Sequence, residues 1–294
     1  MAADLRDWRG KSQARRCPQA GSFDLAGLAR IPDALLRLPV CGLIMCTLSF
    51  LPDRQGYTVA MNRDEQRTRI PASPAGEHDF QDHSQVYPQE PSGGTWIGAD
   101  SSGNLPAILN WYSVDTRGLG AKQKSRGDII PALLHAQDAQ NTDRALSAMQ
   151  LAGIHPFRLV GIFPGEQQVH EWRWDGCALA KQSSDWILSH WFSSSKSDRQ
   201  AESQRGKVFA QKWGKGQNDG AQWLRAIHAR HIPEPGAFSA CVHREDAATV
   251  SYTEVSYQPG GLVMSYQSGN PCQAVGAPAQ VRIPALTSYG RKFS

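Results

Sequence analysis

Cys46 is the residue of this sequence whose position best suits covalent catalysis. It follows Met45 directly, and methionyl aminopeptidases remove a methionine that stands before a small residue. If translation begins at Met45, the mature chain starts with a residue that carries a thiol and a free α-amine on the same carbon. An α-amine has an unperturbed pKa of roughly 8, so near neutral pH it can accept the thiol proton. One residue would then supply both nucleophile and base.

A second polar group stands in the sequence NRDE at residues 62–65. Asp64 could orient the ammonium form of the amine, and Arg63 could favour the thiolate or bind an anionic substrate group. Residues 46–50 and 57–61 have the composition of strands, and residues 51–56 have that of a turn. The pattern therefore predicts a β-hairpin that brings Cys46, Arg63 and Asp64 together.

The alternative interpretation of Cys46 is a small buried hydrophobic residue in an apolar strand. It holds if residues 1–44 are retained, because Cys46 then has no free amine. Three explanations of residues 1–44 compete: a start codon assigned too far upstream, a propeptide cleaved before Cys46, and a genuine disordered arm. We favour the first, and we expect residues 45–294 to form a single domain.

Composition and charge limit the classes of protein to consider. The chain has 294 residues, and 40% of them are hydrophobic, which is enough for a substantial core. The net charge is +4, but residues 1–45 carry seven Lys and Arg against four Asp, so little basic charge is left for a nucleic-acid surface. The six cysteines form no CxxC pair, which favours free thiols in a reducing, cytoplasmic setting.

The longest apolar run does not predict a membrane span. It covers residues 38–51, about fourteen residues, which is too short to cross a bilayer. A lipoprotein-type signal that ends before Cys46 is the alternative, although Asp4 and Asp7 interrupt its basic start. The sequence gives no indication of the oligomeric state.

Strand and helix patterns occur in groups along the rest of the chain. A loop is expected at residues 66–91, and its His78, Asp79, Asp82 and His83 are interpreted as surface residues, so no metal site is expected. Single helices between strands would predict a parallel sheet, whereas this grouping predicts an α+β fold of antiparallel sheets layered with helices. The expected strands are 93–98, 105–111, 157–163, 169–173, 186–192, 237–242, 249–257 and 261–266, and the expected helices are 129–136, 145–151, 202–213 and 220–231.

Asn110 places a polar amide at the end of an apolar strand. In one interpretation it caps the local backbone. In the other its side-chain NH₂ is an oxyanion donor, a role that an amide performs without carrying a charge.

Several motifs in a fixed order resemble the NRDE family, known for its transport and Golgi organisation protein 2-like members. They are Met45-Cys46, Asn62-Arg63-Asp64-Glu65, Gly93-Gly94-Thr95-Trp96-Ile97-Gly98, the strand ending in Asn110, Ser125-Arg126-Gly127, His243-Arg244-Glu245-Asp246 and the strand from Thr249. The resemblance covers about residues 45–272.

The resemblance implies a four-layer αββα N-terminal-nucleophile hydrolase fold, which is shared with cysteine amidases such as penicillin V acylase. It implies Cys46 as nucleophile and base, Arg63 with Asp64 as the orienting pair, and Asn110 as the oxyanion donor. Arg244 is assigned to a later arginine of these amidases. Arg244 joins Asn62, Glu65 and Trp96 as the expected substrate contacts.

Two functions from different classes follow. The first is hydrolysis of the C–N amide bond of a small acyl-amide, with no cofactor. The alternative is a non-enzymatic carrier of haem, because eukaryotic relatives in the resembled family are associated with haem trafficking. Nine Trp, nine Phe and seven Tyr could line an apolar cleft for haem, but aromatic residues more often form a core.

Overall fold

A β-hairpin forms the middle of the larger sheet in the computed structural model, which describes residues 45–80, 83–119, 124–212, 220–232 and 234–285. Its strands are β1 (Met45–Pro52) and β2 (Tyr57–Gln66), and they pair antiparallel with Cys46 opposite Arg63. The expected hairpin is confirmed. Residues 1–44, about which the sequence left three explanations, lie outside the described residues.

The larger sheet has the strand order β10-β1-β2-β11-β12-β13, and every neighbouring pair is antiparallel. Side chains alternate across it, so the odd-numbered residues of β2 and the even-numbered residues of β1 share one face. On that face Leu48, Phe50 and Met61 belong to the main core. The added strands are β10 (Ser189–Ser194), β11 (Ala247–Gln258), β12 (Gly261–Ser268) and β13 (Ala279–Pro284).

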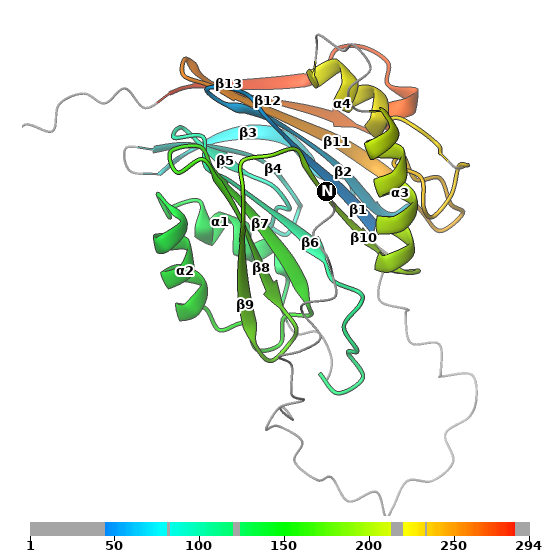
Figure 1. Ribbon diagram of the computed structural model, residues 1–294, viewed down its shortest axis with the longest axis horizontal. Coiled ribbons are helices and arrows are strands. Elements are labelled where there is room, and N and C mark those ends of the chain that lie inside the picture. The colour runs from blue at the N-terminus through cyan, green and yellow to red at the C-terminus, as the bar shows by residue number, and fades with distance from the viewer. Residues whose placement is uncertain (1–44, 81–82, 120–123, 213–219, 233, 286–294) are drawn as a thin grey trace, which may run out of the picture. The chain divides into compact units, whose positions relative to one another are not determined.

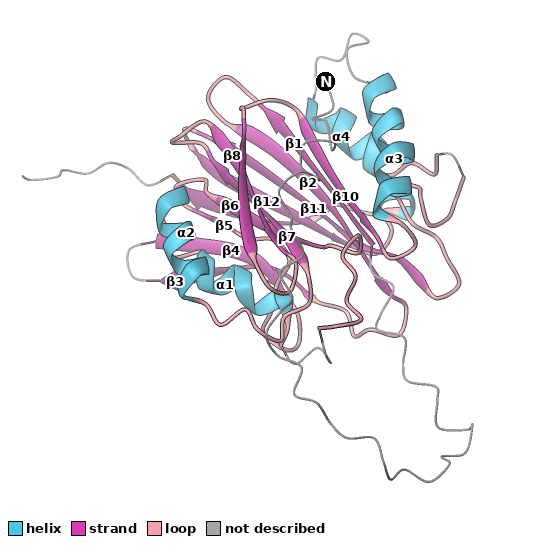
Figure 2. Ribbon diagram, turned by 60° about the horizontal axis from the view of Figure 1, so that its bottom comes forward, coloured by secondary structure: helices cyan, strands magenta, loops and turns pink. Residues whose placement is uncertain are grey.

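A second layer of strands packs on the main core from the opposite side (Figures 1 and 2). It consists of a three-stranded sheet, β3-β4-β5, and a four-stranded sheet, β6-β7-β8-β9. A β-bridge between Ile97 and Ala107 links the segment before β5 to β6. The bounds are β3 (Ser73–Phe80), β4 (His83–Gln89), β5 (Ala99–Asp100), β6 (Leu105–Asn110), β7 (Phe157–Phe163), β8 (Gln168–Trp174) and β9 (Leu179–Ser184).

Helices cover the outer faces of both strand layers. A short η3 (Arg126–Asp128), capped by the Ser125 hydroxyl, leads into α1 (Ile129–Leu133), and Asp138 caps α2 (Ala139–Ala148) through the Asn141 N–H at 2.6 Å. On the other side lie α3 (Asp198–Lys212) and α4 (Gly220–His228), and a second core, which includes Phe209 and Trp223, separates them from the larger sheet. The α+β class and the four-layer order are thus confirmed (Figure 1).

Several expected elements were wrong, because the composition of a segment does not show which strand it pairs with. The expected loop at 66–91 contains β3, which is largely polar, and β4, whose buried residues 85–88 are consecutive and do not alternate with exposed ones. Residues 93–98 are not a regular strand, and the exposed β9 and the C-terminal β13 were missed. Residues 237–242 form no strand, because side chains donate hydrogen bonds to carbonyls that a neighbouring strand would otherwise use. Arg205 donates to the carbonyls of Ala237 and Phe238, and Asn62 donates to that of Ala240.

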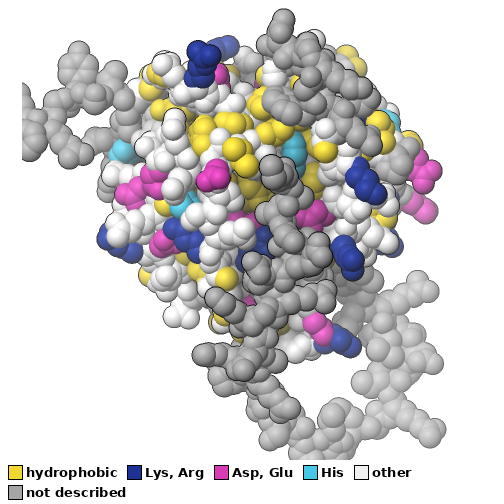
Figure 3. All heavy atoms as spheres, viewed as in Figure 1, with side chains coloured by type: hydrophobic (Ala, Val, Ile, Leu, Met, Phe, Trp, Pro, Cys, Tyr) yellow, Lys and Arg dark blue, Asp and Glu magenta, His cyan; other side chains and the backbone are white. Residues whose placement is uncertain are grey.

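Charged side chains of both signs are interspersed on the face of the molecule drawn in Figure 3. Within the described part of the chain, no helix combines the length and the apolar character that crossing a bilayer would require.

Candidate active site

The thiol of Cys46 lies at the start of β1, between Arg63 of β2 and Ser193 of β10. Its side chain is 5% exposed and belongs to the main core. Burial and the negative charge of Asp64 raise the pKa of Cys46 to about 12, although the Asp64 backbone N–H and the Arg63 charge oppose the shift. The thiol is therefore protonated at neutral pH, and it needs a base before it can act as a nucleophile.

The backbone nitrogen of Cys46 is a peptide nitrogen here, because Met45 precedes it in the same strand. It donates a hydrogen bond to the Ser193 hydroxyl at 3.0 Å. Met45 is fully buried, and the Ser194 hydroxyl donates to its sulfur at 3.3 Å. A chain that began at Cys46 would place its amine opposite the Ser193 hydroxyl. Ser193 belongs to β10, one residue beyond the expected strand at 186–192.

Asp64 turns its carboxylate to the face of the larger sheet that carries α3. The Thr249 hydroxyl donates to Oδ1 of Asp64 at 2.5 Å, and Nη2 of Arg205 lies 3.9 Å from Oδ2. Complete burial raises the pKa of Asp64 to about 7, while the Arg205 charge and the Thr249 hydrogen bond oppose the rise. Asp64 can therefore exchange a proton near neutral pH.

Arg205 is the site residue that the sequence analysis missed. Its side chain is fully buried, and Nη1 donates to the Cys46 carbonyl at 3.3 Å and to the Thr47 hydroxyl at 2.7 Å. The same guanidinium faces Asp64, so it connects the backbone of the nucleophile to the buried carboxylate. A sequence signal exists: Arg205 falls four residues after Ala201 and three before Val208 on the buried stripe of α3.

Arg63 belongs to a network of two arginines and two glutamates. Its guanidinium lies 4.3 Å from the Trp96 ring and donates to Glu65 at 3.2 Å and to Glu90. Arg69 donates to the same two carboxylates, at 2.8 and 2.6 Å. The structure thus brings together Arg63, Glu65 and Trp96, three of the expected site residues.

A cavity of about 250 Å³ opens beside this network. Its lining includes Arg63, Arg67 and Arg69, and Thr249, which also lines it, donates to Asp64. Neither Cys46 nor Asp64 is among the residues that line it. Arg63 and Arg69 are paired with Glu65 and Glu90, so the three arginines exceed the two carboxylates by one positive charge, which suits a small ligand that has an anionic group.

Asn62 and Arg244 are not placed as the expected substrate contacts require. Asn62 is fully buried, and its amide nitrogen donates to the carbonyls of His228 and Ala240 at 2.9 and 2.7 Å. Its amide nitrogen is therefore used to hold the end of α4 and the segment before β11. Arg244 forms an ion pair with Asp246 at 2.7 Å, and the arginine that faces Asp64 is Arg205.

Asn110 ends β6, a strand that contacts β1 and β10. Its amide donates to the Tyr112 hydroxyl at 2.7 Å. The carboxylate of Asp198 connects the residues after Asn110 to β10. It accepts hydrogen bonds from the backbone N–H groups of Tyr112 and Ser194, each at 2.7 Å. The described contacts of Asn110 do not include Cys46, and its oxyanion role stays a prediction.

Two cavities offer little of the aromatic lining that the haem alternative expects. The cavity beside Arg63 and a second one of about 500 Å³ between α4 and β11–β13 are each lined by a single aromatic residue, Tyr266 or Tyr252. Neither is lined by a described histidine, cysteine or methionine, although tyrosine, which can also bind haem iron, lines each. Large aromatic side chains such as Trp172 and Phe50 are instead fully buried in the core.

The pKa of Asp64 predicts a pH-dependent contribution to stability. Because its folded-state pKa, about 7, is raised above the ordinary value of 3.8, its contribution to the free energy of unfolding is fully present below about pH 4 and is lost as pH rises through 7. Urea unfolding of wild type and Asp64→Asn between pH 4 and 8 should show wild type losing stability relative to the variant over this range. A pH-independent difference between the two proteins would contradict the assignment.

Comparisons with known proteins were made on sequence and on structure. The family model described as Transport and Golgi organisation 2 matches residues 45–253. Comparison with curated protein sequences gives no match. Among solved structures, the chain is similar to penicillin V acylase from Agrobacterium tumefaciens, with 10% sequence identity, a TM-score of 0.45, and coverage of 81% of this chain and 86% of that one.

Proposed function

The chain belongs to the Transport and Golgi organisation 2 family, and we propose that it is a cysteine-type N-terminal-nucleophile hydrolase. Its substrate would be a small acyl-amide, whose C–N bond it cleaves. The observation that carries this proposal is the position of Cys46, whose thiol adjoins Arg63 and the Asp64 backbone while its carbonyl is bound by Arg205. The described cysteines have free thiols, which supports the further proposal of a reducing, cytoplasmic location.

The proposed reaction begins with removal of the chain before Cys46. The freed α-amine accepts the thiol proton, and the thiolate forms an S–C bond with the substrate carbonyl. We assign stabilisation of the oxyanion to the Asn110 amide and to nearby backbone N–H groups, which donate hydrogen bonds to it. When the intermediate collapses, the C–N bond breaks and the ammonium returns its proton to the leaving amine. Water, deprotonated by the same amine, then hydrolyses the thioester to the acid and the free thiol.

The polar surroundings support separate roles for the other residues. Arg205 and Asp64 would fix the backbone of the nucleophile from the α3 side of the sheet. Arg63, Arg67 and Arg69 would attract a carboxylate on the substrate, because all three arginines line the adjacent cavity. We therefore propose acyl-amides that carry a carboxylate as the preferred substrates.

The test compares two chains that differ only at the N-terminus, one beginning at Cys46 and one in which Met45 is retained. Each is assayed for amine release from a panel of acyl-amides with and without a carboxylate. The first chain should release amine, most rapidly from the carboxylate-bearing members, and the second should be inactive. Equal rates from the two chains would show that a free amine on Cys46 is not required.

A further inference from the structure

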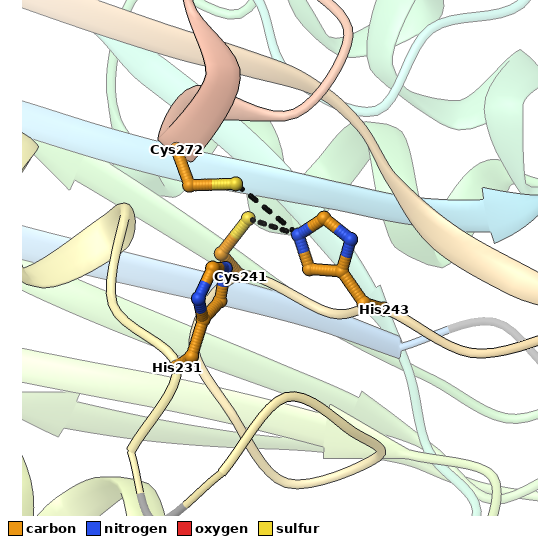
Figure 4. A group of neighbouring side chains, drawn as sticks. All are labelled: His231, Cys241, His243 and Cys272. Atoms are coloured by element: carbon orange, nitrogen blue, oxygen red, sulfur yellow. Dashed lines mark hydrogen bonds between the residues drawn. The ribbon is translucent and has the colours of Figure 1, made fainter.

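Four side chains with metal-ligating atoms meet beside the larger sheet, and they come from three segments of the chain (Figure 4). His231 follows α4, Cys241 and His243 lie in the segment before β11, and Cys272 lies in η4 (Pro271–Gln273) after β12. Their ligand atoms all lie within 4.8 Å of one another. The sequence analysis expected no metal site, and it did not consider these four residues, whose three segments come together only in the fold.

The distances within the cluster approach those of a tetrahedral coordination shell. His243 Nε2 lies 3.2 Å from the Cys272 sulfur and 3.5 Å from the Cys241 sulfur. A nitrogen and a sulfur bound to the same tetrahedral Zn²⁺, at about 2.1 and 2.3 Å, lie about 3.6 Å apart. The rings of His231 and His243 are 4.8 Å apart at an interplanar angle of 87°, so they approach the cluster without stacking.

A ring nitrogen of His231 gives independent support for a ligand bound by the cluster. Its Nε2 atom is buried and has no hydrogen-bond partner among the described residues. A buried polar atom left without a partner is costly, and such an atom in a folded protein calls for an explanation. A metal ion at the centre of the cluster would bond to this nitrogen and remove the cost.

We propose that His231, Cys241, His243 and Cys272 bind one Zn²⁺ ion in a tetrahedral site. Two thiolates and two imidazoles in this geometry select zinc among the divalent metals available to proteins, since hard cations such as Mg²⁺ prefer oxygen ligands. All four coordination positions are filled by the protein. The site is therefore structural, because a catalytic zinc ion keeps a position open for water or substrate.

The zinc ion would stabilise the segment that supports the candidate active site. The Cys241 N–H donates to the Arg230 carbonyl at 3.0 Å, and the next N–H, that of Val242, donates to the Thr249 hydroxyl at 2.8 Å. Thr249 in turn donates to Asp64. The same segment, at residues 237–240, contains three carbonyls that accept hydrogen bonds from Arg205 and Asn62. Loss of the metal would loosen these contacts whether or not the chain is a hydrolase.

The first experiment measures metal in the untagged full chain purified without chelators. Elemental analysis should find about one zinc ion per chain in wild type, and the ion should be lost in Cys272→Ser and His231→Gln. The matched control is Cys177→Ser, because Cys177 is an exposed free cysteine outside the cluster, and it should retain zinc. Chelator treatment should lower the unfolding temperature of wild type and Cys177→Ser by roughly 5 °C or more and leave that of Cys272→Ser unchanged.

The second experiment does not depend on the folding of a variant. Wild type stripped of zinc is titrated with Co²⁺, which should give the visible bands of a tetrahedral ion and the ultraviolet thiolate-to-cobalt band at one equivalent. Six-coordinate cobalt spectra, or no binding by protein whose thiols are free, would overturn the proposal. So would a Cys241–Cys272 disulfide in protein purified without reductant, because it would consume both thiolates.

Discussion

Amide hydrolysis by the chain that begins at residue 46 is expected to fall by roughly 10³-fold or more when Cys46 is replaced with Ala. The substitution removes the sulfur that forms the covalent intermediate but leaves the α-amine in place. It also leaves a small apolar residue at a position that packs on the main core. The loss should therefore appear in kcat, while the unfolding temperature changes little.

Two variants separate this prediction from general damage. Cys177→Ala removes an exposed thiol and should keep full activity. Cys46→Ser keeps a weaker nucleophile and should retain a small fraction of the wild-type rate. If Cys46→Ala and wild type release amine at rates within twofold of each other, Cys46 is not the nucleophile.

Replacing Arg205 with Met should destabilise the fold by about 3–5 kcal/mol, because it leaves Asp64 buried opposite an apolar side chain. It also removes the hydrogen bonds to the Cys46 carbonyl and the Thr47 hydroxyl. The cost should be smaller at pH 5 than at pH 8, since Asp64 can be neutralised by a proton at the lower pH. Urea unfolding at the two pH values measures both effects.

The control for this variant is Arg117→Met, which removes an exposed arginine paired with Asp115 and should leave the free energy of unfolding nearly unchanged. The double variant Asp64→Asn, Arg205→Met should recover part of the loss, because no charge is then left buried. Equal costs for the Arg205 and Arg117 variants would mean that Arg205 does not hold the site together.

The part of the site that was predictable from sequence is the part made by neighbours in one hairpin. The strand content of residues 46–50 and 57–61 and the turn between them set the register that pairs Cys46 with Arg63. Side chains alternate along a strand, however, so the Asp64 carboxylate lies on the opposite face of the larger sheet from the Cys46 thiol. Its partners there, Thr249 and Arg205, are distant in the sequence, and no local pattern pairs them with it.

The same limit explains the errors in the fold. β7, with its continuous apolar sequence, was predicted with the observed bounds. β9 was missed because it is mostly exposed and polar, so only its pairing with β8 makes it a strand. The segment before β11 was predicted as a strand from its apolar residues, but its carbonyls bind side chains of α3 and β2 instead. Tertiary contacts determine these segments.

Processing at Cys46 links the chemistry to the structure. In the described chain the thiol has a pKa of about 12 and its own nitrogen is a peptide group, so it has no adjacent base. Removal of Met45 would supply that base beside the Ser193 hydroxyl, which already accepts a hydrogen bond from the same nitrogen. The residues before Cys46 therefore decide between a nucleophile and a buried, inert thiol.

The most direct measurement is the intact mass and N-terminal sequence of the protein produced from its native gene in its own cells. The hydrolase account predicts a chain whose first residue is Cys46. A protein that retains Met45, or any longer part of the preceding sequence, would contradict it.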